Sequence, residues 1–287
     1  MVRIFKDSYK GINLKFSVLL SLYDKENPAW LEACLDSIIN KQTLPPTQII
    51  LVEDGPINIS LSGVLDNYQK VKKVDFRRVK LEQNVGLGSA LKVGLESCSF
   101  ELVARMDTDD VAEPIRFEKQ IEFFLENPDI DILGTSALDI DEHGEVLKIQ
   151  RKLPEKSEDI YKNMWACPIL HPSVMFKKSF ILAVGSYSTS LKRRQDYELW
   201  FRCAEAGAVF HNLQEPLVKY RITAQSYRKN SFDVSLIQAK IGLRGALSLK
   251  LGFKAYIGVF YPVLKSILPN SLRLFLIDKL KRFDPRR

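Results

Sequence analysis

The chain has 287 residues, of which 46% are apolar and 27% charged, a globular composition that suits one large domain or two ordinary ones. The formal net charge is +7, and the basic excess is concentrated in the last segment, Lys250 to Arg287, as is typical of contact with an anionic surface. The N-terminus lacks the apolar core of a signal peptide, and no uncharged apolar run reaches the ~18 residues of a spanning helix, so we expect a soluble or peripheral protein.

Strands and helices alternate through the first hundred residues. An apolar, β-prone run at 16–23 predicts a buried strand, and the Asn27-Pro28 step then begins a helix. This alternation predicts an α/β fold with a mostly parallel central sheet flanked by helices. The expected strands of this half are 16–23, 48–52, 74–81 and 102–106, and the expected helices are 28–39, 61–68 and one that begins after 84–89.

The pattern continues less regularly beyond residue 110. Pro114 begins a helix that closes at Asn127-Pro128, and Gly207 ends a helix that begins near Arg194. The other expected elements are strands at 130–135, 137–140, 171–176 and 216–221, a turn at 141–144, and helices at 157–165 and 180–187.

The segment 227–287 changes character and predicts a basic, helical C-terminal tail after a domain that spans 1–226. Its apolar residues suggest amphipathic helices around 237–247, 256–264 and 272–280. Aromatic and aliphatic residues beside Lys and Arg are what an interfacial membrane helix needs. The alternative is that these helices pack on the main domain.

An acidic stretch follows the expected strand at 102–106. Asp107, Asp109 and Asp110 fall within four residues, and such a density of negative charge is costly unless a cation neutralises it. Carboxylate oxygens suit Mg²⁺ or Mn²⁺, and open α/β sheets bind ligands beyond the carboxyl ends of their strands. We therefore interpret the stretch as a metal-diphosphate site. The alternative is an acidic turn that caps the next helix.

Two further aspartates stand at places where a site could form. Asp54 follows the second expected strand and can accept from a nucleobase imide, or it can serve as a turn residue before Gly55-Pro56. Asp196 stands at the start of a helix, where an N-cap is the alternative to a functional role.

The cysteines and histidines indicate no zinc site and no disulfide framework. None of the cysteines shows Cys-x-x-Cys spacing, so a reducing cytosol is expected, and the histidines are far apart in the chain. These residues are Cys34, Cys98, Cys167 and Cys203, and His143, His171 and His211.

Taken together, the motifs resemble the family 2 glycosyltransferases of the GT-A fold, particularly the bacterial enzymes of O-antigen and capsule synthesis. The resemblance runs in collinear order over about residues 14 to 222. The motifs that carry it are Phe16–Tyr23, Val52–Gly55, Asn84–Leu91, Ala104–Asp110, Pro114–Gln120, His171–Phe176 and Gln195–Trp200.

The resemblance implies a role for each candidate residue. A nucleotide-binding half, about 14–110, would hold the donor, and an acceptor half, about 111–226, would hold the acceptor. Asp109 would ligate Mn²⁺ or Mg²⁺, and Asp196 would be the base that deprotonates the acceptor hydroxyl. Ser21, Tyr23, Asp54 and Asp107 would bind the donor nucleotide, and Asp110, His171, Arg194 and Gln195 are possible substrate-binding residues.

The implied activity is the inverting transfer of one hexose, with galactose from UDP-galactose as the expected sugar, onto an undecaprenyl-diphosphate-linked acceptor. The enzyme would sit peripherally on the inner face of the bacterial inner membrane, held through 227–287, and would not bind nucleic acid. One departure is that Thr223 stands where many relatives have a histidine lid ligand. The alternatives are a sugar-1-phosphate nucleotidyltransferase and a non-catalytic nucleotide-sugar-binding protein.

Overall fold

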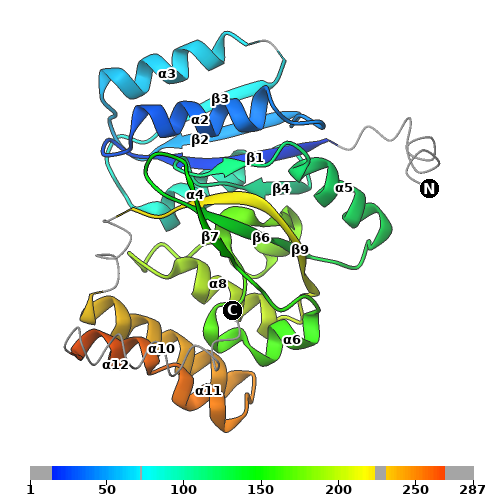
Figure 1. The fold of residues 1–287 in the computed structure, drawn as a ribbon, viewed down its shortest axis with the longest axis vertical. Coiled ribbons are helices and arrows are strands. Elements are labelled where there is room, and N and C mark those ends of the chain that lie inside the picture. Colours follow the sequence, from blue (N-terminus) through cyan, green and yellow to red (C-terminus); the bar gives the residue numbers. More distant parts are fainter. Residues whose placement is uncertain (1–14, 72, 224–230, 269–287) are drawn as a thin grey trace.

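The computed structural model describes residues 15–71, 73–223 and 231–268 (Figure 1). In its N-terminal half, every expected strand and helix is present within a few residues of its expected bounds. Asn27 caps the first helix by accepting from the Ala29 amide at 2.9 Å, and Asn58 caps the next by accepting from the Leu61 amide at 3.0 Å. The elements are β1 Phe16–Leu22, α2 Pro28–Ile39, β2 Gln48–Glu53, α3 Ile59–Gln69, β3 Asp75–Lys80, α4 Leu87–Ser97 and β4 Leu102–Arg105.

The C-terminal half adds shorter strands and helices. Two expected strands, 130–135 and 137–140, form one continuous strand, and 216–221 is the end of a longer one. The elements are β5 Val111–Ala112, α5 Arg116–Glu126, β6 Ile132–Ile140, β7 Val146–Gln150, α6 Ser157–Lys162, η1 Met164–Ala166, η2 His171–Ser173, β8 Met175–Lys177, α7 Lys178–Ala183, α8 Gln195–Glu205 and β9 Phe210–Arg221.

All the described strands belong to one nine-stranded sheet in the order β3-β2-β1-β4-β8-β6-β9-β5, with β7 paired to β6. Pairing is parallel from β3 to β4 and between β6 and β9, but β8 runs antiparallel to both β4 and β6. The expected α/β fold is confirmed, and the sheet is mixed rather than mostly parallel. Local sequence patterns identify strands but do not fix which strands pair across the chain.

The expected strand at 171–176 is wrong in its first half. Residues His171–Ser173 form a 3₁₀ turn, and strand β8 begins only at Met175. Pro172 explains the difference, because its backbone carries no N–H for a sheet ladder and its fixed φ suits the first turn of a helix.

Helices cover both faces of the sheet. Alternate residues of β1, from Phe16 to Leu22, pack against α2, α3 and α5, whereas Leu19 points into a second core with α4, α6 and α8. This alternation follows from the two-residue period of a strand. The two cores hold the sheet rigid, so that its carboxyl edge presents side chains at fixed positions.

The first of the C-terminal helices lies against α8, the second contacts η1, and the last one described packs on the first (Figure 1). They are α10 Phe232–Ser248, α11 Phe253–Gly258 and α12 Tyr261–Ile267; the third helix expected in the tail, 272–280, falls outside the described residues. Gly245 of α10 packs on the ring of Phe201, where a Cβ would come within 2.1 Å of the ring. Among the described residues, none of the helices has the length and apolar character required to cross a bilayer.

Candidate functional site

The candidate residues that follow β1, β2 and β4 lie at one edge of the sheet. These strands are adjacent and parallel, with Leu22 opposite Glu53 and Leu19 opposite Arg105. Ser21 near the end of β1, and Tyr23, Asp54 and Asp107 after the strands, therefore lie along one edge. The strand pattern of the sequence predicts this placement for Asp54 and Asp107.

Tyr23 faces the acidic stretch. Burial raises the pKa of its hydroxyl, the negative charges of Glu26 and Asp109 raise it further, and the positive charge of Arg193 acts in the opposite direction. Tyr23 is thus within electrostatic reach both of the residues after β4 and of the loop before α8.

Asp107, Asp109 and Asp110 form a compact cluster, in which one carboxylate oxygen from each lies within 4.8 Å of the others. Asp110 is 1% exposed; its Oδ1 accepts from the Arg221 amide at 2.8 Å, and its Oδ2 has no hydrogen-bond partner. Burial and the neighbouring charges of Asp109 and Asp107 hold the pKa of Asp110 well above its ordinary value. Asp110, which the resemblance implies as a possible substrate-binding residue, is thus the most buried member of the acidic cluster.

The cluster fits a divalent cation. It offers hard oxygen donors from three side chains, including the buried Asp110 Oδ2 that no protein donor satisfies. A cation bound there would offset the mutual repulsion of the carboxylates. Mg²⁺ and Mn²⁺ suit such an all-oxygen donor set, because both prefer carboxylate and water ligands.

Two buried arginines lie on the protein side of the acidic cluster. Arg105 is 1% exposed and forms an ion pair with Asp107, while the fully buried Arg116 donates to the Arg105 carbonyl at 2.8 Å. Burial lowers the pKa of Arg116 to about 9. Sequence reasoning missed both roles, although a signal was present for Arg105: a charged residue that interrupts an apolar strand has to find a partner when buried.

Arg221 ties the cluster to the neighbouring loops. Besides its backbone contact with Asp110, its Nε donates to the Asp109 carbonyl and its Nη1 to the Asp141 carbonyl, both at 2.8 Å. Its guanidinium lies 5.0 Å from the centre of the Trp30 ring. Near the end of β9 the family resemblance singles out only Thr223, and the structure shows that Arg221 shapes the site.

Asp54 holds the loop that begins α4. Its side chain is buried, and its two carboxylate oxygens accept from the Val85 amide at 2.7 Å and the Gly86 amide at 3.0 Å. Gly86 has φ +89°, a left-handed conformation that glycine adopts without strain. Asp54 is therefore a structural residue of the loop, whether or not it also accepts from a nucleobase.

The start of α8 lies next to the start of α4. A Cβ on Gly88 would come within 2.3 Å of the Ser188 carbonyl oxygen and 3.5 Å of the Gln195 Cβ, so the two segments pack closely. Arg194, with φ +63°, occupies the N-cap position and Asp196 lies in the first turn. The N-cap interpretation of Asp196 is therefore wrong, and its half-buried carboxylate is not required to cap the helix.

His171 connects the two sides of the site. Its Nε2 lies 3.0 Å from the Tyr187 hydroxyl, and both side chains are buried. Burial raises the pKa of Tyr187; the positive charge of Arg105 opposes this shift, and the negative charges of Asp196 and Asp107 add to it. Asp107 and Asp196 thus act on one hydroxyl, and the structure brings the acidic cluster and the start of α8 to the same region.

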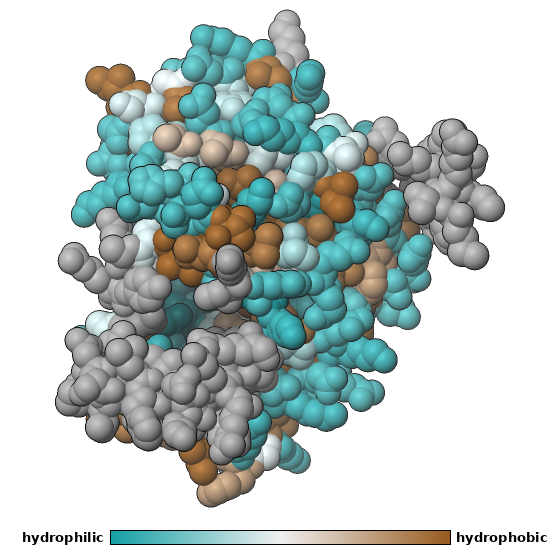
Figure 2. All heavy atoms as spheres, in the orientation of Figure 1, coloured by the Kyte–Doolittle hydropathy of each residue, from teal (hydrophilic) through white to brown (hydrophobic). Residues whose placement is uncertain are grey.

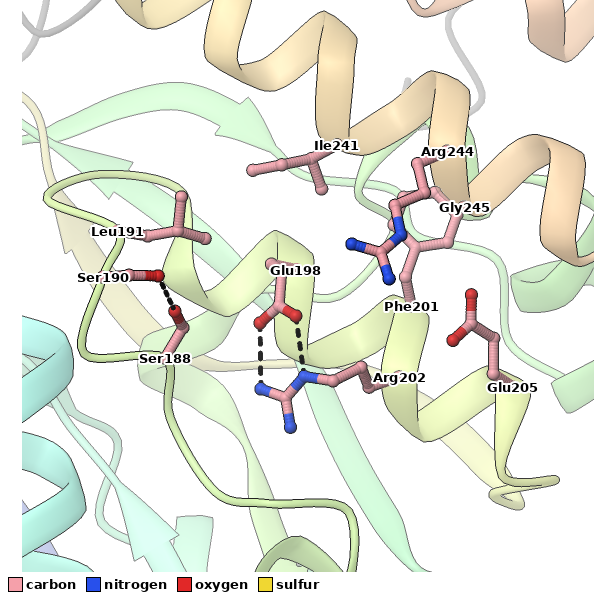
Figure 3. Close-up of a pocket in the computed structure, with 10 residues that line it drawn as sticks. All are labelled: Ser188, Ser190, Leu191, Glu198, Phe201, Arg202, Glu205, Ile241, Arg244 and Gly245. Carbon is pink, nitrogen blue, oxygen red and sulfur yellow. Dashed lines mark hydrogen bonds and ion pairs between the residues drawn. The ribbon is translucent and has the colours of Figure 1, made fainter.

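A separate cavity of about 240 Å³ lies between α8, the loop 188–191 and α10 (Figure 3). Glu198 and Arg202 form an ion pair at 2.7 Å along its wall, and Arg244 of α10 faces it. Asp196 is roughly 200° around the helix from Glu198, so it projects from a different face of α8. The cavity is therefore distinct from the region around Asp196.

Comparison with known proteins identifies a family and several relatives. Residues 17–198 match the family described as Glycosyl transferase family 2. The chain is 36% identical over 274 residues to the amylovoran biosynthesis glycosyltransferase AmsE of Erwinia amylovora, covering 92% of this chain and 98% of that protein. It is 29% identical over 270 residues to the UDP-Gal:alpha-D-GlcNAc-diphosphoundecaprenol beta-1,3-galactosyltransferase of Escherichia coli, covering 93% and 97%.

A solved structure has the same fold. TarS 1–349 of S. aureus in complex with UDP-GlcNAc matches with a TM-score of 0.66 at 17% sequence identity, over 94% of this chain and 80% of that one. This likeness confirms the expected GT-A architecture.

Proposed function

This chain belongs to glycosyl transferase family 2, and on that premise we propose that it transfers one hexose from a UDP-sugar to a lipid-linked acceptor in bacterial surface polysaccharide synthesis. The observation that carries the proposal is the cluster of Asp107, Asp109 and Asp110 at the carboxyl edge of the sheet, on the same side as Asp196. Family membership sets aside the nucleotidyltransferase alternative.

The donor would bind across the carboxyl ends of β1, β2 and β4, in the half formed by residues 14–110. Ser21 and Tyr23 would contact the uridine, with Asp54 accepting from the base or shaping the loop beside it. Asp109, with Asp107 and Asp110, would hold Mn²⁺ or Mg²⁺. A divalent cation there supplies charge neutralisation for the diphosphate leaving group.

The acceptor would bind in the half formed by residues 111–226, with its hydroxyl at Asp196. A carboxylate opposite the leaving group takes the proton as the oxygen attacks the anomeric carbon, and a single displacement inverts that centre. Arg194, Gln195 and His171 adjoin this position and are proposed to shape the acceptor or donor-sugar site.

For the substrates, we propose UDP-galactose as donor, a β-linkage as product and an undecaprenyl-diphosphate-linked sugar as acceptor. The support is the similarity to the E. coli enzyme whose name states those substrates. The acceptor's lipid would place the enzyme peripherally on the inner face of the inner membrane.

A donor-by-acceptor screen tests the proposal by measuring UDP release with Mn²⁺ and reading the product linkage by NMR. We expect UDP, and not pyrophosphate, as the leaving group, and loss of Mn²⁺-stimulated transfer in Asp109→Asn. Binding of UDP without turnover across the panel would leave only the non-catalytic alternative.

The base assignment has its own test. Asp196→Asn should lower kcat by about 10²–10⁴-fold while UDP binding stays unchanged. Glu205→Gln, an exposed acid on the same helix, is the matched control and should turn over at the wild-type rate. Near-normal kcat in Asp196→Asn would reject Asp196 as the base.

A further inference from the structure

Helices α11 and α12 expose large apolar side chains. Phe253 is 78% exposed, Ile257 60% and Ile267 61%, and Phe260 and Leu264 are more than 40% exposed. Phe253 and Ile257 belong to α11, Leu264 and Ile267 to α12, and Phe260 lies in the turn between them. The five follow one another at intervals of four, three, four and three positions, the spacing typical of a helix face. They form what we call the apolar stripe.

The inward face of α11 and of the turn after it carries smaller residues instead. Ala255 and Val259 are buried, and Gly258 lies so close to Trp165 that a Cβ would come within 2.2 Å of its ring. In α11 the usual arrangement of a surface helix, with large apolar residues inside, is therefore reversed. Because the inward contacts are already close, the stripe is not needed to dock these helices on the protein.

The stretch of chain that carries the stripe has charges of one sign only. No Asp or Glu occurs between Asp233 and Asp278. The basic residues that the structure describes in that interval are Lys240 and Arg244 of α10, Lys250 in the turn before α11, Lys254 of α11 and Lys265 of α12. A single-sign basic region around an apolar surface is complementary to an anionic, partly apolar partner, which describes a bilayer of anionic lipid.

We propose that α11 and α12 are the membrane-docking face of the protein, with the apolar stripe inserted at the headgroup boundary of an anionic bilayer. In Figure 2 apolar atoms emerge along the lower edge of the molecule, where α11 lies in Figure 1. The inference rests on the proposed function only in that a lipid-linked acceptor requires a membrane nearby. Docking would hold α10, and through it α8, against the bilayer surface.

Vesicle sedimentation of the full-length protein tests the proposal without using its activity. Wild type should sediment with vesicles that contain phosphatidylglycerol and much less with phosphatidylcholine alone. The triple variant Phe253→Ser, Ile257→Ser, Phe260→Ser should bind the anionic vesicles about ten-fold or more weakly, because each change removes apolar area from the interface. Ile59→Ser, at a 91% exposed residue of α3, is the matched control and should bind as wild type.

The outcomes separate docking from transfer. Circular dichroism and UDP release with a short-chain, water-soluble acceptor should be unchanged in the triple variant, which establishes that it is folded and active. Equal vesicle binding by wild type and triple variant would overturn the proposal even if glycosyl transfer is confirmed. A wild-type dimer that dissociates in the triple variant, without vesicle binding, would assign the stripe to a second copy of the chain and also overturn it.

Discussion

Replacing Asp54 by asparagine tests whether its carboxylate holds the loop into α4. In the wild type, both oxygens accept from backbone amides, those of Val85 and Gly86. Asparagine keeps one acceptor oxygen but directs an NH₂ group at the other amide, so that one bond is lost and a donor faces a donor. Bonds to a charged group contribute about 1.5–3 kcal/mol each, and the remaining bond also loses its charge. We expect Asp54→Asn to lower the free energy of unfolding by about 2–4 kcal/mol.

The assay is denaturant unfolding of the ligand-free protein, so that no nucleotide contact contributes. Asp129→Asn, at an exposed aspartate distant in sequence from the loop, is the control and should change the unfolding free energy by less than about 0.5 kcal/mol. Asp54→Asn within that same range would refute the structural role of the carboxylate. UDP affinity, measured by calorimetry on the folded variant, then reports separately on the nucleobase role.

Three further predictions concern packing, pH and metal. Gly245→Ala should destabilise the protein by about 1–3 kcal/mol by forcing α10 off the Phe201 ring, whereas Gly252→Ala, where a Cβ meets nothing within 4 Å, should be nearly neutral in the same unfolding assay. Burial and the charge of Arg105 hold the pKa of His171 well below its ordinary value, so stability should fall below about pH 6.5 by up to ~1.4 kcal/mol per pH unit. His171→Gln should reduce that slope in unfolding curves recorded from pH 7 to 5; an unchanged slope would contradict it. EDTA should weaken UDP binding in calorimetry, and Mn²⁺ should restore it; metal-independent binding would argue against a metal-diphosphate site.

The N-terminal half could be read from the sequence because its signals are local. An apolar run, an Asn cap and a helical repeat each act within a few residues, and Asn27 and Asn58 cap the helices that follow them. Parallel strands joined by helices also have a fixed crossover hand, so strand ends that carry Asp54 and Asp107 must reach one edge. Placement of the donor-side residues follows from these rules.

The rest depends on contacts between distant residues. The antiparallel insertion of β8 between β4 and β6 joins segments far apart in the chain, and no local pattern specifies it. The support of the cluster by Arg221 spans more than a hundred residues, and β7 is a partly exposed strand with a weak apolar pattern. The sequence showed which residues carry charge, but the partner of each charge became visible only in the folded chain.

The hydrogen bonds between Arg221 and the turn after β6 bear on which residues of that turn can vary. Its guanidinium holds the carbonyl oxygens of Asp141 and Glu142, and Trp30 donates its indole N–H to the same Glu142 carbonyl at 3.1 Å. Because these acceptors are main-chain carbonyls, the hydrogen bonds do not depend on the side chain at position 142. Substitutions of the exposed side chain at position 142 should therefore leave the acidic cluster of Asp107, Asp109 and Asp110 in place.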